Sequence, residues 1–102
     1  MNQKKLVRKR FRDSVFERDG HKCVFCNVSE NLDAHHITDR TLMPNGGYVF
    51  ENGITVCEKH HLICEQFHIT GNSVLGFSPD DLYKRIGSSH EKAVAASERL
   101  KS

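Results

Sequence analysis

The stretch GITVCEKHHLICEQFH, residues 53–68, combines a predicted strand, a pair of metal-type ligands and a predicted helix. Residues 53–57 are typical of a strand because Thr and Val side chains suit a pleated surface. A helix is expected from about Glu58 to about Phe67 or His68, ending before Gly71. Cys57 and His60 fall where the strand becomes the helix. Zinc prefers four ligands, so this pair needs partners from elsewhere in the chain.

A second knuckle of equal length, Cys23-x-x-Cys26, lies about thirty residues before Cys57-x-x-His60. A tight turn is the usual way to present two tetrahedral zinc ligands. We therefore predict a structural Zn²⁺ bound by Cys23, Cys26, Cys57 and His60. This ion would fasten the end of an N-terminal helix to the start of the later one. Two alternatives remain: the cysteines are small buried hydrophobic residues, or Cys64 replaces His60 as the fourth ligand.

Residues 33–38, DAHHIT, place two histidines side by side on a predicted strand. Neighbouring side chains of a strand point to opposite faces, so His35 and His36 should have different roles. One can face the following helix, where His61 and Glu65 lie four residues apart on one face. We predict that His35, His61 and Glu65 bind a divalent cation with positions left open for water and phosphate.

The other histidine, His36, is then free to act as a general base. Its pKa is expected near neutrality, which suits removal of a proton from water. Asn52 opens the second strand and could fix the tautomer and orientation of His36. His68, one turn beyond Glu65, is an alternative third ligand.

The N-terminal residues predict a basic helix. Leu6 or Val7, Phe11 and Val15 share one side, and Asp19-Gly20 is a natural helix stop. Residues 1–22 hold eight basic and three acidic side chains, a net charge of +5, whereas the other eighty hold seven and ten, a net charge of −3. A basic end on a nearly neutral body is typical of proteins that bind polyanions, although a solvated helix end has the same composition. The candidate phosphate contacts are Arg8, Lys9, Arg10, Arg12 and Arg40.

The rest of the chain predicts a loop over residues 39–51, a helix capped by Ser78 with Asp81 in capping-box position, and a last helix over residues 90–102. We expect a single small α+β domain made of strand, loop, strand and helix flanked by helices. Its parts are a basic helix (1–22), the knuckles and core (23–68) and a helical extension (69–102).

The composition agrees with a metal-stabilised fold. Apolar residues make up 37% of 102 residues, which is thin for a self-sufficient core. There is no N-terminal apolar run and no stretch long enough to cross a membrane, so a cytoplasmic location and no membrane partner are expected. In a reducing compartment the four cysteines should be thiolate ligands rather than disulfides.

The segments AHHI, ENGITVC and CEKHH together resemble the HNH nuclease family, whose core is the ββα-metal motif. The His, Asn and His of the family name match His36, Asn52 and His61, sixteen and then nine residues apart. Many members also carry two zinc knuckles in a treble-clef-like arrangement, with a basic helix ahead of them. The resemblance covers about residues 8–68, some 60% of the chain.

This resemblance implies that His35 is the first metal ligand, His36 the general base, Asn52 the residue that orients the base, and His61 the second metal ligand. Glu65 departs from the colicin-type pattern, which has a histidine at that position. The expected catalytic cation is Mg²⁺, Mn²⁺ or Ni²⁺, and a carboxylate at this position shifts the preference toward harder ions such as Mg²⁺ or Mn²⁺.

The resemblance further implies a metal-dependent endonuclease that hydrolyses DNA phosphodiester bonds and leaves 5′-phosphate and 3′-hydroxyl ends. Double-stranded DNA, held through its phosphates with little sequence specificity, is the expected substrate. Small free-standing members occur in phage packaging, restriction and mobile elements. The main alternative is a non-catalytic zinc-stabilised nucleic-acid-binding module, and a metal-stabilised protein-interaction domain is a third. Apolar positions in the C-terminal helices could pack internally or bind a partner protein or a second copy: Leu82, Ile86, Val94 and Leu100.

Overall fold

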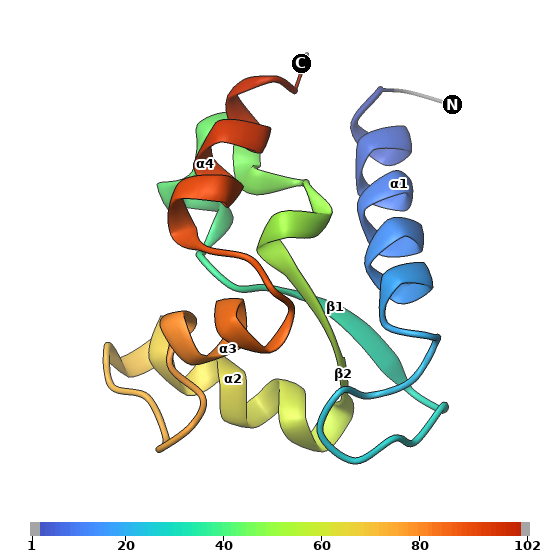
Figure 1. Ribbon diagram of the computed structural model, residues 1–102, viewed down its shortest axis with the longest axis vertical. Helices are drawn as coiled ribbons and strands as arrows, with labels where there is room; N and C mark the ends of the chain where they lie inside the picture. Colours follow the sequence, from blue (N-terminus) through green and yellow to red (C-terminus); the bar gives the residue numbers. More distant parts are fainter. Residues whose placement is uncertain (1–2, 101–102) are drawn as a thin grey trace.

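The computed structural model describes residues 3–100, which form a small α+β fold with a two-stranded sheet and four α-helices (Figure 1). In chain order the elements are α1 (Gln3–Arg18), β1 (Leu32–His36), β2 (Gly53–Cys57), α2 (Glu58–Thr70), α3 (Pro79–Arg85) and α4 (His90–Glu98). The predicted order of strand, loop, strand and helix, flanked by helices, is confirmed. Residues 1–2 of the predicted basic segment and 101–102 of the predicted last helix lie outside the described residues.

The two strands are antiparallel, with Leu32 opposite Cys57 and His36 opposite Gly53. Every residue of β2 is buried because helices cover both of its faces. On one face the Thr55 hydroxyl donates to the Val15 carbonyl of α1. On the other face, Ile54 and Val56 pack in the core with side chains of α2 and α3. The alternation along β1 therefore sends neighbouring side chains to different helices.

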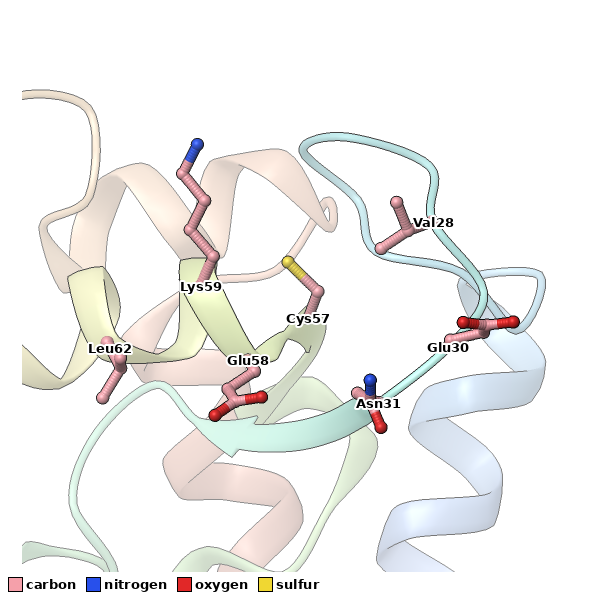
Figure 2. A pocket seen from close by; sticks show the side chains of 7 residues that line it. All are labelled: Val28, Glu30, Asn31, Cys57, Glu58, Lys59 and Leu62. Atoms are coloured by element: carbon pink, nitrogen blue, oxygen red, sulfur yellow. The ribbon is translucent and has the colours of Figure 1, made fainter.

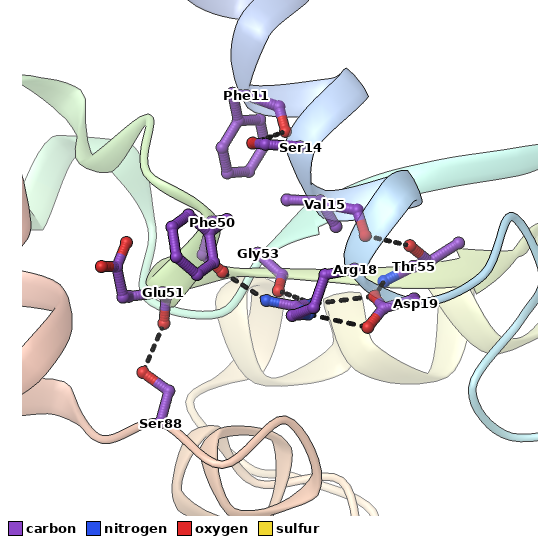
Figure 3. A network of polar contacts seen from close by, with 10 residues as sticks. All are labelled: Phe11, Ser14, Val15, Arg18, Asp19, Phe50, Glu51, Gly53, Thr55 and Ser88. Carbon is purple, nitrogen blue, oxygen red and sulfur yellow. Dashed lines mark hydrogen bonds and ion pairs between the residues drawn. The ribbon is translucent and has the colours of Figure 1, made fainter.

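Helix α1 lies directly against β2 at Gly53. A Cβ atom at this residue would lie 2.5 Å from Val15 Cγ2 and 2.7 Å from Phe11 Cε1, so no larger residue fits without movement. Arg18 fastens the end of α1 by donating to the Gly53 carbonyl over 2.7 Å, and Asp19 accepts from the Thr55 amide over 2.9 Å (Figure 3). Arg18 also pairs with Asp19, so this cation of the basic segment holds the helix to the sheet.

The connection between the strands contains three short 3₁₀ turns, at Arg40–Leu42, Pro44–Gly47 and Phe50–Asn52. Strand β1 ends at His36, two residues earlier than predicted, because the next backbone groups bond to Asn52 instead of a strand ladder. Helix α2 extends to Thr70 and stops at Gly71, whose φ of 78° is the left-handed conformation that ends helices.

The C-terminal segment packs onto this core. The predicted capping box of α3 is confirmed: the Ser78 hydroxyl accepts from the Asp81 amide, and the Asp81 carboxylate accepts from the Ser78 amide. Leu82 is buried, and Ile86 and Val94 pack against the same cluster, so these apolar positions serve internal packing. No helix in residues 3–100 is long and apolar enough to cross a membrane.

Candidate metal centre and histidine cleft

Three cysteines and one histidine converge where α1, β2 and α2 meet. Cys23 and Cys26 lie in the turn after α1, Cys57 ends β2, and His60 lies in the first turn of α2. Their ligand atoms all lie within 4.8 Å of one another. The turn is closed by the Asn27 amide, which donates to the Cys23 carbonyl over 2.9 Å. The predicted ligand set is therefore assembled from two knuckles on separate elements.

The spacing of these atoms fits a tetrahedral zinc ion. With bonds of about 2.3 Å to sulfur and about 2.0 Å to nitrogen, the tetrahedron edges are about 3.8 Å between sulfurs and about 3.5 Å from sulfur to nitrogen. Cys26 Sγ and Cys57 Sγ lie 3.8 Å apart, and His60 Nδ1 lies 3.6 Å from Cys23 Sγ and 3.2 Å from Cys57 Sγ. All four cysteines are free thiols. The Cys₃His cluster could bind zinc.

Cys64 belongs to the core instead. It is buried beside Ile54 and Val56, and burial, followed by the nearby Cys23 and Glu65, raises its pKa to about 12. By contrast, the pKa of Cys23 is lowered: burial acts in the opposite direction, but backbone hydrogen bonds, the largest at Phe25, outweigh it. His60 rather than Cys64 completes the group of four.

A separate cleft of about 400 Å³ is lined by residues of α1, β1, the connection after β1 and α2. Its floor is His35, which is 2% exposed and has no hydrogen-bond partner at either ring nitrogen among the described residues. His35 Nδ1 lies 3.2 Å from Glu65 Oε1, an ion-pair contact without hydrogen-bond geometry, and the ligand atoms of His35, Glu65 and His68 lie within 4.8 Å of one another. Burial, followed by the neighbouring histidines, lowers the pKa of His35 to about 3, so the imidazole is neutral and could accept a cation.

His61 lies at the edge of this group. Its Nε2 is 3.2 Å from Glu65 Oε1, and its Nδ1 is 3.3 Å from Asp33 Oδ2. The compact group of ligand atoms contains both Glu65 and His68 with His35 and omits His61. His68, which the sequence offered as a substitute for Glu65, therefore lies beside it. His68 also bonds through Nε2 to the His36 carbonyl over 3.0 Å. Whether His61 binds a cation stays a prediction.

His36 points to the opposite face of β1, toward α1. Its ring stacks on Phe11 with centroids 4.4 Å apart and meets Tyr48 edge-on at 4.8 Å. Burial, followed by the charge of Arg40, lowers its pKa to about 4, so the expectation of a near-neutral value from the sequence is wrong. Its Nε2 is buried and has no hydrogen-bond partner within residues 3–100. His36 is thus a neutral imidazole that lines the same cleft as His35.

Asn52 does not orient His36 through a direct contact. Its Oδ1 accepts from the Thr38 amide over 2.9 Å and from the Tyr83 hydroxyl over 2.8 Å. Its Nδ2 donates to the carbonyls of Thr38 over 3.1 Å and Gly47 over 3.2 Å. These four hydrogen bonds use both donors and both acceptor positions of the Asn52 amide. Asn52 therefore holds the backbone after β1 and the loop that follows it.

The predicted basic contacts are divided among different surfaces. Arg8 and Arg40 line the histidine cleft together with Tyr48. Burial acts to raise the pKa of Tyr48, but hydrogen bonds from the two guanidinium groups outweigh burial and lower it. Arg12 lies over the Phe16 ring, and Lys9 pairs with Asp13 over 2.6 Å. Arg10 lines a different depression on the surface, together with Arg99. Two of the five predicted residues are therefore at the cleft.

A depression of about 530 Å³ lies beside the Cys₃His cluster, between the first knuckle and α2. Figure 2 shows the carboxylates of Glu30 and Glu58 on its two sides, and Lys59 is the one cation among its lining residues. The charges of this depression do not favour a polyanion. The histidine cleft holds Arg8 and Arg40 with Asp39 and Glu65, and cations outnumber acids in the neighbouring depression on α1, which is lined by Arg8, Lys9, Arg12, Asp13 and Phe16.

The sequence analysis missed Tyr48 and Tyr83, because neither lies in a motif and both reach their partners through tertiary packing. Asp33 lies two residues before the double histidine, and its carboxylate is the type of side chain that pairs with a histidine.

Searches against family models, curated proteins and solved structures each give no match.

Proposed function

We propose that this protein is a metal-dependent endonuclease of the HNH type that hydrolyses phosphodiester bonds of DNA. The observation that carries the proposal is the content of one cleft. Its His35 imidazole is buried without a hydrogen bond, and Glu65 and His68 lie beside it with atoms that could bind a cation. The neutral His36, on the opposite face of the strand, and two arginines, Arg8 and Arg40, line the same cleft.

The cation would be held by His35, Glu65 and His68, with His61 as a further candidate beside Glu65. When bound, such an ion supplies Lewis-acid stabilisation of the charge that develops on a phosphate and on its leaving oxygen. A ligand set that mixes imidazole with a carboxylate suits Mg²⁺, Mn²⁺ or Ni²⁺. The Cys₃His cluster would hold a separate, structural Zn²⁺.

His36 would take the proton from the attacking water. Its pKa of about 4 keeps the ring neutral, so one of its two nitrogens is an acceptor, and no hydrogen bond within residues 3–100 occupies Nε2. A bound phosphodiester would bring negative charge beside the imidazole and offset the positive charge of Arg40, which raises the affinity of His36 for a proton as the reaction needs it.

Arg8 and Arg40 would bind phosphate oxygens on either side of the reacting group. The Arg40 guanidinium reaches the Tyr48 hydroxyl over 3.3 Å, which holds it at the cleft. Because Arg8 comes from α1 and Arg40 from the loop after β1, a phosphate bound to both would lie across the cleft mouth. Contacts of this kind position the backbone without reading bases, so little sequence preference is expected.

The test is nicking of supercoiled plasmid at low salt, after chelation and with Mg²⁺, Mn²⁺ or Ni²⁺ added back. We expect cation-dependent nicking by the wild type and loss of at least a hundredfold in His36→Ala, with zinc content unchanged. Arg8→Ala should weaken DNA binding, whereas Arg12→Ala, one turn along the same helix but outside the cleft, is the matched control.

Zinc-loaded wild-type protein that binds DNA but cleaves with none of these cations would contradict the proposal. The result would favour the non-catalytic nucleic-acid-binding module. Equal nicking by the wild type and His36→Ala would instead remove His36 from the role of general base.

A further inference from the structure

The C-terminal extension contacts the candidate site through one buried hydroxyl. Tyr83 lies in α3 and is 2% exposed, and its hydroxyl donates to Asn52 Oδ1 over 2.8 Å. A phenol has a single proton, so the 2.6 Å contact between this hydroxyl and Thr38 Oγ1 must have threonine as the donor. Tyr83 therefore bridges Asn52 and Thr38.

These two partners control the backbone that carries His36. Asn52 accepts from and donates to the main chain of Thr38, and its own carbonyl accepts from the Ile37 amide over 2.9 Å. His36 itself is paired with Gly53. Residues 36–38 are thus fixed to residues 52–53 by successive bonds, and Tyr83 closes the last of them from a different element.

We infer that Tyr83 is a positioning residue, and this inference rests on the proposed function. The Tyr83 hydroxyl holds Asn52 and Thr38 in place, and these two residues fix the position of the His36 imidazole. The extension is then part of the working site. Buried polar networks of this kind hold a unique arrangement when every member is satisfied, and they loosen when one member is lost.

Tyr83→Phe tests the inference because it removes the hydroxyl and keeps the buried ring. Amide hydrogen exchange at Thr38, whose N–H bonds to Asn52, should accelerate at least tenfold relative to the buried Val56 of β2. In the nicking assay kcat should fall at least tenfold, while KM stays within twofold because Arg8 and Arg40 are untouched.

Ser97→Ala is the matched control. Ser97 is also fully buried in the C-terminal extension, but its hydroxyl has no hydrogen-bond partner in the part of the chain that the structure describes. This variant should leave both the exchange at Thr38 and kcat unchanged. Thr38→Val, which removes the Tyr83 contact from the other side, should reproduce the effect of Tyr83→Phe and add little to it in the double variant.

The outcomes separate this inference from the proposed function. Wild-type exchange at Thr38 and wild-type kcat in Tyr83→Phe would overturn it. If the wild type does not cleave DNA, the proposed function fails, and exchange at Thr38 alone decides whether Tyr83 positions this backbone. If Tyr83→Phe does not fold, Thr38→Val is read by kcat and by amide exchange at Ile37, whose N–H bonds to the Asn52 carbonyl.

Discussion

The imidazole of His36 stacks on the phenyl ring of Phe11, with ring centroids 4.4 Å apart and an interplanar angle of 22°. This contact joins the basic helix α1 to the strand that carries both candidate site histidines. The ring of Phe11 also removes water from His36, and burial is the largest cause of its low pKa. Helix α1 carries Arg8, a proposed phosphate contact, and through Phe11 it also favours the neutral form of His36.

The pKa of His36 predicts a stability that declines in mild acid. The unfolded chain binds a proton at this histidine near pH 6.5, whereas the folded protein binds it only near pH 4. Below pH 6.5 the unfolded state therefore takes up the proton first and stability falls. From pH 7.5 to 5.0 the wild type should lose about 2 kcal/mol more free energy of unfolding than His36→Gln.

Urea unfolding of both proteins at several pH values, without added divalent cations, measures this difference. Other acid-sensitive groups, including the zinc ligands, contribute to both curves, and only groups that interact with His36 differ: the charge of His36 is the last of the causes that lower the pKa of His35. Parallel curves for the two proteins would show that the pKa of His36 is close to its unfolded value.

The Cys₃His cluster predicts a fold that depends on zinc. Metal analysis should give one Zn²⁺ per chain, and chelation should abolish the cooperative thermal transition because the metal joins α1, β2 and α2. His60→Ala should lose the metal. Cys64→Ala should keep it and lose only the stability of a filled core position, about 1–2 kcal/mol. Zinc retained in His60→Ala and lost in Cys64→Ala would exchange the two assignments.

Asp33 predicts a second effect on metal binding. Its carboxylate lies 3.3 Å from His61 Nδ1, and His61 Nε2 faces Glu65. If His61 binds the cation, Asp33→Asn should weaken Mn²⁺ binding about 10–100-fold, because outer carboxylates fix the tautomer of ligand histidines. Mn²⁺ titration followed by electron paramagnetic resonance measures it, with the exposed Asp13→Asn as the control. Unchanged affinity would place His61 outside the ligand set.

The close approach at Gly53 predicts a steric effect that reaches the cleft. Gly53→Ala should lower the free energy of unfolding by about 1–3 kcal/mol, since its new methyl group overlaps Val15 and Phe11. Displacement of Phe11 should also shift the His36 ring resonances in NMR spectra. Gly87→Ala adds the same methyl group where nothing lies within 4 Å. Its φ of 69° strains the alanine backbone and lowers stability, but the His36 resonances should stay in place. Unshifted His36 resonances in Gly53→Ala would show that α1 yields without moving Phe11.

The sequence alone determined the features that depend on local spacing. The matched knuckles predicted the Cys₃His group, Gly71 and Ser78 marked a helix end and a helix start, and the alternation of a strand separated His35 from His36. The two ligands within each knuckle, the helix limits and the strand alternation depend on residues a few positions apart, where backbone geometry fixes the relation between side chains. The joining of the two distant knuckles was predicted from the four ligands that zinc needs.

Only the tertiary structure decided the features that depend on distant packing. The low pKa of His36 comes from burial against α1, the four bonds of Asn52 reach as far as Tyr83, and Arg18 contacts the sheet while Arg8 reaches the cleft. A side chain's composition and spacing do not specify its solvent exposure or its partners across the fold. Those quantities set protonation states and hydrogen bonds, and they are fixed only when the helices close over the sheet.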